Sequence, residues 1–358
     1  MQMYNFVAVI TTPMKEKLLG KTPAELREIA LSLGLKAFVG DQLCSWMYSS
    51  RVRSFDDMKN ISSVAKSKLS EKYTLGLTPY AEVFTSKDGT KKYLFGKDEE
   101  VCANLLVEAV VIPSEDRQTL CVSCQRGCKM GCRFCMTGRQ GFHGNLDVAE
   151  ILSQFIAIDE CKSLTNAVFM GMGEPMDNYD NVLRAIEVLT APWGFGWSPK
   201  RITLSTVGVI PGMKRFLENT QVHLAVSLHN AREDEREEMM PVQKAYRLKD
   251  VIDLIKLYDW SGQRRVSFEY TMFSKWNDDK AHADALARLL KGLECRVNLI
   301  RFHSIPDFDY TTSPDVVMQN FQKRLMDQGV TCTIRSSRGE DIFAACGLLA
   351  GKESTSGK

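Results

Sequence analysis

The chain has 358 residues, 44% hydrophobic and 25% charged, as is typical of a globular protein with one large domain or one large and one small. Its formal net charge of +2 excludes a strongly basic surface overall, so any contact with nucleic acid must come from local patches. No run of 18 apolar residues and no secretory signal is visible, so we expect no contact with a membrane and a cytoplasmic location where the 11 cysteines stay reduced.

The beginning of the chain is predicted to be helical. Apolar residues recur at helical spacing from Leu26 to Leu33, and Gly34 follows as a stop. Residues 42–48 and 64–73 predict two more short helices. We therefore expect a helical accessory domain over residues 1–78.

A β hairpin is predicted next, because Asp88-Gly89 lies between the alternating stretches 80–85 and 91–95. Residues 105–112 continue as a strand, which Pro113 is expected to end. This hairpin and strand form a predicted extension over residues 79–113.

From residue 114 onward, β-branched runs alternate with helical stretches of ten to fifteen residues, which predicts a parallel sheet with crossover helices. The region is shorter than the roughly 250 residues of a closed eight-unit barrel, so a partial (β/α)6 barrel is expected over residues 114–349. The fold class is therefore α/β, and residues 350–358 are expected to form a disordered tail. The runs that predict strands are 119–123, 167–170, 201–205, 222–227, 265–271, 296–301 and 331–335.

Three cysteines, Cys128, Cys132 and Cys135, stand in a short loop with separations of four and three residues. Three thiolates can hold three irons of a [4Fe–4S] cube and leave one iron open, as catalytic metal sites keep a position for substrate. An open iron can chelate S-adenosylmethionine (SAM) and pass it an electron. A structural zinc site is the alternative, but it prefers paired cysteines and four ligands. With Phe134 before the last cysteine, the loop resembles that of the radical SAM superfamily.

Polar and glycine-rich clusters follow the predicted strands, where a barrel gathers its chemistry. Gly173 and Glu174 belong to the turn Gly171-Met-Gly-Glu-Pro175, whose carboxylate can accept bonds from an ammonium group. With the cysteines, this turn favours contact with the amino group of SAM. Ser205, Ser227 and His229 at other strand ends are candidates for its carboxylate and ribose.

Two further cysteines are candidates for chemistry. Cys346 lies in a small-residue loop near the end of the chain, where an inert buried thiol is the ordinary interpretation but a planar substrate could reach it. Cys121 ends the first barrel strand. Its spacing to Cys124 also matches a dithiol redox motif or half of a zinc site, although no second pair is present.

Over residues 14–351 the chain resembles the RlmN-type dual-specificity RNA methyltransferases, which methylate C2 of adenosine in 23S ribosomal RNA and in tRNAs. The motifs that carry the resemblance are Thr119-Leu-Cys-Val-Ser123, the cysteine loop, Gln140-Gly-Phe142 with Asn145-Leu146, Gly171–Pro175, Ser205-Thr206, Ser227-Leu-His229, Val297-Asn-Leu-Ile300 and Arg338-Gly-Glu-Asp-Ile342 through Ala345-Cys-Gly347.

The resemblance implies that Cys346 is methylated first, that Cys121 resolves a later protein–RNA thioether by forming a disulfide, and that Glu108 accepts a proton. It implies SAM contacts by Gly173, Glu174, Ser205, Ser227, Leu228 and His229, and by His303, although the family usually has an asparagine there. Cys124 also departs from the family, which has a serine. One [4Fe–4S] cluster per chain and two SAM per turnover are implied.

The implied partners are 23S rRNA, tRNA and an electron donor such as flavodoxin with its reductase, and we expect a monomer. One alternative is a relative that methylates adenosine C8, as antibiotic-resistance enzymes do; these typically lack the proline that stands here as Pro175. Another is a non-catalytic RNA-binding protein stabilised by a metal. A third is a radical SAM enzyme acting on a protein or small molecule, which would not need Cys346.

Overall fold

The computed structural model describes residues 15–96, 106–262 and 264–350. Within them a ten-stranded sheet runs in the order β14-β13-β12-β11-β10-β9-β6-β5-β4-β3. The strands from β6 to β14 in this order pair in parallel, whereas β3, β4, β5 and β6 pair antiparallel to one another. The strands of this sheet are β3 Tyr80–Thr85, β4 Lys91–Phe95, β5 Val107–Ser114, β6 Arg117–Cys121, β9 Asn166–Phe169, β10 Ile202–Thr206, β11 His223–Ser227, β12 Val266–Met272, β13 Arg296–Arg301 and β14 Thr331–Ile334.

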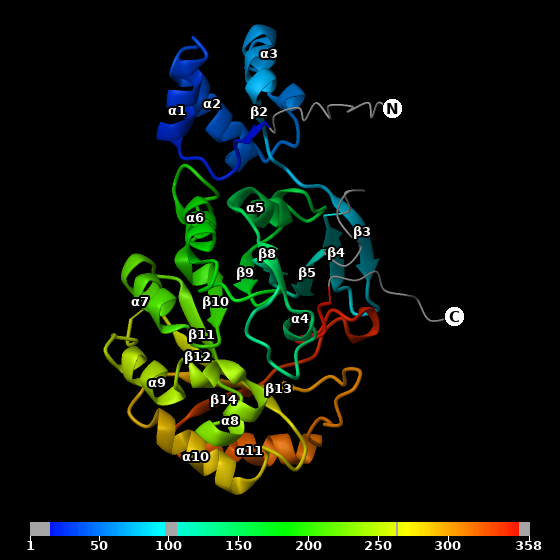
Figure 1. Cartoon of the computed structure of the whole chain (residues 1–358), viewed down its shortest axis with the longest axis vertical. Helices are drawn as coiled ribbons and strands as arrows, with labels where there is room; N and C mark the ends of the chain where they lie inside the picture. The colour runs from blue at the N-terminus through cyan, green and yellow to red at the C-terminus, as the bar shows by residue number, and fades with distance from the viewer. Residues whose placement is uncertain (1–14, 97–105, 263, 351–358) are drawn as a thin grey trace, which may run out of the picture.

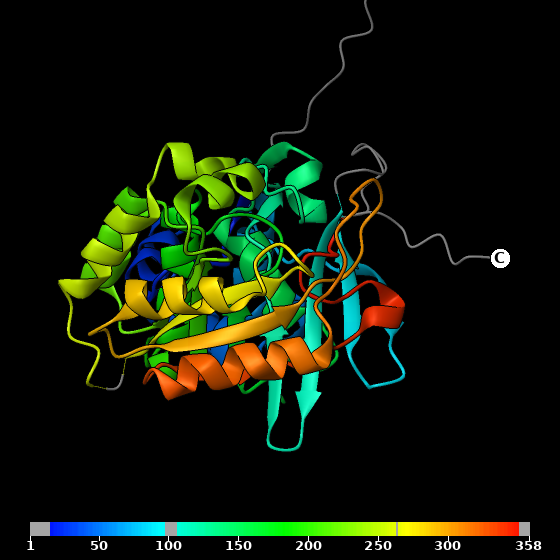
Figure 2. The same ribbon diagram turned by 90° about the horizontal axis from the view of Figure 1, so that it is seen from below.

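Helices connect the parallel strands and cover the outside of the curved sheet, which Figures 1 and 2 show from two sides. In the described part of the chain, six strand–helix units from β6 to α11 precede the last strand, β14, so the partial (β/α)6 barrel is confirmed. The connecting helices are α5 Val148–Ile156, α6 Tyr179–Thr190, α7 Ile210–Asn219, α8 Glu233–Met239, α9 Leu248–Lys256, α10 Lys280–Leu290 and α11 Asp315–Asp327. Short 3₁₀ turns cover Phe55–Asp57, Pro199–Arg201, Pro241–Lys244 and Glu340–Ile342.

A small helical region precedes the sheet and lies against α5 and α6 (Figure 1). It contains α1 Pro23–Ser32, α2 Phe38–Cys44 with the π-helical turn Ser45–Ser50, α3 Ser63–Lys72, and a two-stranded pair of β1 Glu16–Lys17 with β2 Tyr73–Thr74. Thr22 and Glu25 form a capping box that starts α1.

This region is fixed to the barrel by polar and apolar contacts. Lys17 pairs with Asp147, the N-cap of α5, at 2.6 Å, and the Arg51 guanidinium donates to the carbonyl of Cys161. One continuous apolar core includes residues of both parts. No helix in the described ranges is long and apolar enough to cross a membrane.

The hairpin of β3 and β4 lies where the sequence predicts it, and the strand after it runs further than expected. β5 continues through Pro113, which pairs with Gln118 of β6, so Pro113 does not end the strand. Proline removes one N–H donor and is tolerated where the ladder does not use it. Figure 2 shows the β5–β6 hairpin, in teal, projecting from the sheet. The expected tail, 350–358, lies outside the described residues apart from Ala350.

Candidate active site

The cysteine loop is held by a small antiparallel pair, β7 Gln125–Gly127 with β8 Phe142–Asn145. Gly127 has a φ of +69°, and a Cβ there would lie 1.9 Å from the carbonyl oxygen of Gly141. The backbone N–H of Cys128 donates to that same carbonyl at 2.8 Å. Only glycine therefore allows the close approach of the two strands from which the loop begins.

All three cysteines of the loop line one cavity at the carboxyl ends of the parallel strands. Cys132 is buried, and Cys128 and Cys135 are half-buried. Burial raises the pKa of Cys128 to about 12, so it becomes a thiolate at neutral pH only when a metal binds it.

The donor set fits an iron–sulfur cube. Among the described residues, no three His, Cys, Asp or Glu side chains converge closely enough to hold one metal ion, so a four-ligand zinc site has no candidate there. The irons of a cube each take their own thiolate, and three thiols around one cavity suit such a cluster with one iron open.

The turn after β9 packs on the segment that precedes the cysteine loop. A Cβ on Gly171 would lie 2.6 Å from Ser123 Oγ, and Gly173 has a φ of +101°. The backbone N–H groups of Cys124 and Gln125 both donate to the carbonyl of Met172. The glycines thus allow the contact that brings the turn to the wall of the cysteine cavity.

Glu174 is a buried carboxylic acid in that wall. Its two oxygens accept backbone N–H groups of Met176 at 3.0 Å and Val207 at 2.9 Å. Burial raises the pKa of Glu174 to about 7, although these hydrogen bonds act against the increase. The side chain therefore joins the ends of β9 and β10 and can gain or lose a proton near neutral pH.

Ser205, Ser227 and His229 line the same cavity from β10 and from the end of β11, and the two serine oxygens lie 3.5 Å apart. Burial, together with the positive charge of Arg236, lowers the pKa of His229 to about 3. The backbone N–H of Thr271 donates to Nδ1 of this neutral ring at 3.0 Å, so the ring proton is on Nε2. His229 is thus a hydrogen-bond donor in the cavity wall.

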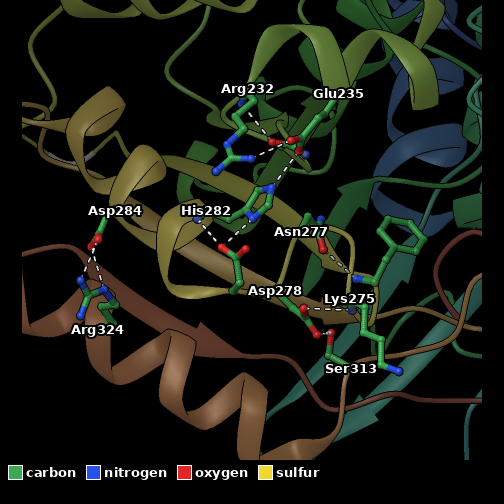
Figure 3. A network of polar contacts seen from close by, with 12 residues as sticks. Arg232, Glu235, Lys275, Asn277, Asp278, His282, Asp284, Ser313 and Arg324 are labelled. Carbon is green, nitrogen blue, oxygen red and sulfur yellow. Dashed lines mark hydrogen bonds and ion pairs between the residues drawn. The ribbon is translucent and has the colours of Figure 1, made fainter.

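His229 has a φ of +58°, a conformation that a non-glycine residue keeps only with support. This support comes from Asn277, which is fully buried. Its side-chain amide donates to the carbonyls of His229 and Thr271, both at 2.8 Å, and its Oδ1 accepts the backbone N–H of Phe273. Figure 3 shows Asn277 and, in the same view, the pair formed by Glu235 and His282, whose Nε2 lies 2.7 Å from the carboxylate.

Arg236 is a second support that sequence reasoning missed. It is buried and donates to the carbonyls of Val207, Ser227 and Leu228 at 2.8 to 3.1 Å. Burial lowers the pKa of Arg236 to about 10. Leu228 is itself buried, and only its backbone takes part in this network. The pattern around Arg236 is that of an exposed acidic helix, so no local signal marks it as buried.

Cys346 is brought into the cysteine cavity by the segment after β14. Its neighbour Gly347 accepts the backbone N–H of Met136, directly after Cys135, at 2.8 Å. Cys346 is an exposed residue that lines this cavity. Cys346, the thiol most distant from the cysteine loop in the sequence, therefore lies beside that loop in the fold.

Cys121 is buried next to this segment, in an apolar cluster with Ala344 and Leu349. Burial raises the pKa of the Cys121 thiol to about 12, and the neighbouring Cys346 sulfur adds to the increase. Both cysteines are free thiols. The structure thus brings these two sulfurs within electrostatic range of each other.

Two of the expected site residues lie elsewhere within the described part of the chain. Glu108 is buried on β5, outside the lining of the cysteine cavity, with Oε1 3.8 Å from Nζ of Lys92. His303 lines a second cavity, where its Nε2 is 3.3 Å from Ser337 Oγ. A contact between His303 and SAM stays a prediction, as does a proton-accepting role for Glu108.

Comparisons with known proteins agree with this architecture. A family model described as the radical SAM superfamily matches residues 122–286, and one described as the ribosomal RNA large subunit methyltransferase N-terminal domain matches residues 16–75. A Porphyromonas gingivalis protein named probable dual-specificity RNA methyltransferase RlmN is 54% identical over 95% of both chains. A Syntrophus aciditrophicus protein named dual-specificity RNA methyltransferase RlmN is 40% identical over 92% of this chain and 94% of its own. The crystal structure of a radical SAM methyltransferase from Sphaerobacter thermophilus is 35% identical, with a TM-score of 0.88, over 94% of this chain and 100% of that chain.

Proposed function

The chain belongs to the RlmN-type family of radical SAM RNA methyltransferases, and on that premise we propose that it methylates C2 of an adenosine in 23S rRNA and in tRNA. The observation that carries this proposal is the position of Cys346, whose side chain lines the same cavity as Cys128, Cys132 and Cys135. A radical SAM enzyme that did not transfer a methyl group through a cysteine would have no need of a thiol there.

Members of the superfamily use a [4Fe–4S] cluster and SAM. We assign the cluster to the three loop cysteines and SAM to Gly173, Glu174, Ser205, Ser227, Leu228 and His229, with His303 as a further candidate. When bound, these groups supply one-electron cleavage of SAM and so a radical that can abstract hydrogen. One cluster per chain and two SAM per turnover are expected.

Cys346 would act as the methyl carrier. Adenine C2 lies between two ring nitrogens and is electron-poor, so it cannot attack the electrophilic methyl group of SAM. A cysteine sulfur can, and Cys346 lines the cavity where that transfer would occur. Loss of hydrogen from the S-methyl group then lets its carbon bond to C2, which links protein and RNA through a thioether.

Cys121 would release the product. After the S-bound carbon has bonded to C2, one electron would have to leave the adduct, for which the oxidised cluster would be the acceptor, and the C2 proton would leave to Cys121 or Glu108. The Cys121 thiolate would then attack the Cys346 sulfur, the bond between that sulfur and the transferred carbon would break, and a Cys121–Cys346 disulfide would form. The released carbon would take up a proton to become the methyl group, which leaves the ring aromatic. The packing of Cys121 in one cluster with Ala344, two residues before Cys346, supports this step, and Oε1 of Glu108 lies 3.8 Å from Nζ of Lys92.

The adenosine must leave its stack to reach Cys346, at a cost of about a few kcal/mol, so unpaired bases in loops are the expected substrates. We further expect a cytoplasmic monomer, with no membrane contact, that takes electrons from a donor of the flavodoxin type. An external reductant would also restore the two thiols after each turnover.

Nucleoside mass spectrometry tests the proposal. Anaerobically reconstituted protein is incubated with 23S rRNA or tRNA, SAM and reductant, and 2-methyladenosine is the expected product. 8-Methyladenosine would show the resistance-type activity instead. No methylated nucleoside, with one zinc in place of about four irons and four sulfides, would show the non-catalytic binding protein. Methylated RNA from Cys346→Ala would contradict transfer through this thiol.

A further inference from the structure

A second cavity opens on the other side of Cys346. Its walls come from β5, from the amino ends of β6, β9, β10 and β11, from the carboxyl end of β13 and from the segment after β14. Seven Lys and Arg side chains line it and, among the described residues, no Asp or Glu does. Cys346 and Ile300 line both this cavity and the cysteine cavity, so the two meet at the methyl-carrying thiol.

Five of these cations form no ion pair within the residues that the structure describes. They are Arg117, Lys200, Arg201, Arg265 and Arg338, and all five are exposed. The other two cations of the cavity are paired: Arg301 lies 2.8 Å from Asp315, and Arg335 lies 3.9 Å from Glu269.

The uncompensated charge acts on its surroundings. His223 begins β11 between these cations, and the backbone N–H of Arg265 donates to its Nδ1 at 3.1 Å. Burial lowers the pKa of His223, and the positive charges of Arg265, Arg264 and Lys200 lower it further. The cavity therefore carries a net positive field that an external anion would neutralise.

The two cavities differ in the ligand that they suit. The cysteine cavity has two acidic side chains, Glu174 and Glu269, and hydroxyl groups, as a small zwitterionic cofactor requires, whereas the described residues that line the second cavity include cations and no acid. Lys and Arg that contact phosphates position a nucleic acid without reading its sequence. This difference assigns SAM to the cysteine cavity and RNA to the second cavity, on opposite sides of Cys346.

We propose that the RNA substrate reaches Cys346 through the second cavity, with Arg117, Lys200, Arg201 and Arg265 binding the phosphates on either side of the target adenosine. The inference rests on the proposed RNA methylation and adds the route and the residues. The cofactor side and the RNA side of the site are thereby separate surfaces, which can be disabled independently.

The test uses the reconstituted holoenzyme and the variant Lys200→Gln/Arg201→Gln. The matched control is Lys256→Gln/Lys291→Gln, which removes two exposed cations outside both cavities. Binding of a stem–loop RNA with an unpaired adenosine is measured by fluorescence anisotropy from 50 to 200 mM salt. Each lost phosphate contact lowers the log–log salt slope by about 0.7, so the test variant should lose about 1.4 and the control nothing.

Methylation of Cys346 by SAM without RNA, read by protein mass, reports the cofactor side. The proposal predicts a raised KM for RNA in the test variant, with Cys346 methylation as in the control. An unchanged salt slope and KM would overturn it, and so would an equal loss of Cys346 methylation. Loss of inorganic phosphate binding with RNA affinity intact would also overturn it, in favour of a free-anion site. If wild-type enzyme makes no methylated RNA, the proposed function fails instead.

Discussion

The Oδ2 atom of Asp88 accepts the backbone N–H of Gly339 at 3.0 Å, which ties the turn of the β3–β4 hairpin to the segment that carries Cys346. Asp341 completes the contact from the other side, because it accepts the hydroxyl of Ser86 and the N–H of Lys87. Burial alone would raise the pKa of Asp88, but hydrogen bonds from Thr90 and Gly339 lower it to about 2. The hairpin turn thus acts as an anionic clamp on the reactive-cysteine segment at neutral pH.

Asp88→Ala should slow methylation of Cys346. The variant removes the acceptor for Gly339, so the segment samples positions away from the cavity, and we expect about a fivefold lower rate, the effect of roughly one hydrogen bond. The rate is measured by protein mass with SAM and reductant but no RNA. Asp116→Ala, in the turn of the other hairpin, is the control and should match wild type. A wild-type rate for Asp88→Ala would show that the clamp does not position Cys346.

Cys121→Ala should accumulate a covalent protein–RNA adduct. Without the second thiol nothing attacks the Cys346 sulfur, so the thioether remains and the complex migrates slowly on a denaturing gel until nuclease is added. Cys124→Ser is the control, since it removes the other thiol of the same short motif and should leave no adduct. If Cys121→Ala turns over without an adduct, another group resolves the thioether.

Acid should destabilise the protein through His229. Its pKa is about 3 in the folded chain and about 6.5 when unfolded, so the unfolded state binds more protons between these values. Above about pH 6.5, protonation of His229 has no effect on stability. Below that pH, the free energy of unfolding falls by up to about 1.4 kcal/mol per pH unit. Anaerobic urea unfolding at pH 6.5 and 5.5 measures this slope. His229→Gln should have a flatter dependence, and an identical slope in both proteins would show that His229 does not contribute.

Asn277→Ala should weaken SAM binding while RNA affinity stays the same. Two buried carbonyls, those of His229 and Thr271, lose their donor, at a cost of about 1–3 kcal/mol, and the strained His229 backbone is released. About a tenfold higher SAM KM is expected. Lys275→Ala changes an exposed side chain of the same loop and serves as the control (Figure 3). Equal losses of SAM binding and of RNA affinity would indicate that Asn277→Ala unfolds the protein generally, and would contradict a role for Asn277 in positioning His229.

The sequence predicts those parts of the fold and site whose chemistry is local. Asp88-Gly89 marks its hairpin because the turn type requires those residues, and the spacing of Cys128, Cys132 and Cys135 is set within one loop. The prediction that Pro113 ends its strand was wrong, because one missing N–H group does not stop a strand. Asn277 and Arg236 could not be predicted, since their partners lie on other elements and nothing nearby in the sequence marks them as buried. The clamp joins residues about 250 positions apart, a distance that no local pattern spans.

Cys346, which we propose accepts the methyl group, follows the cysteine loop by more than two hundred residues. A protein shortened by proteolysis or a premature stop just before Gly339 would keep every loop cysteine and lose the acceptor. Such a fragment would consume reducing power and cofactor without modifying any nucleotide. If the proposed role of Cys346 holds, the segment from Gly339 to Gly347 therefore decides whether cleavage of SAM leads to methylated RNA.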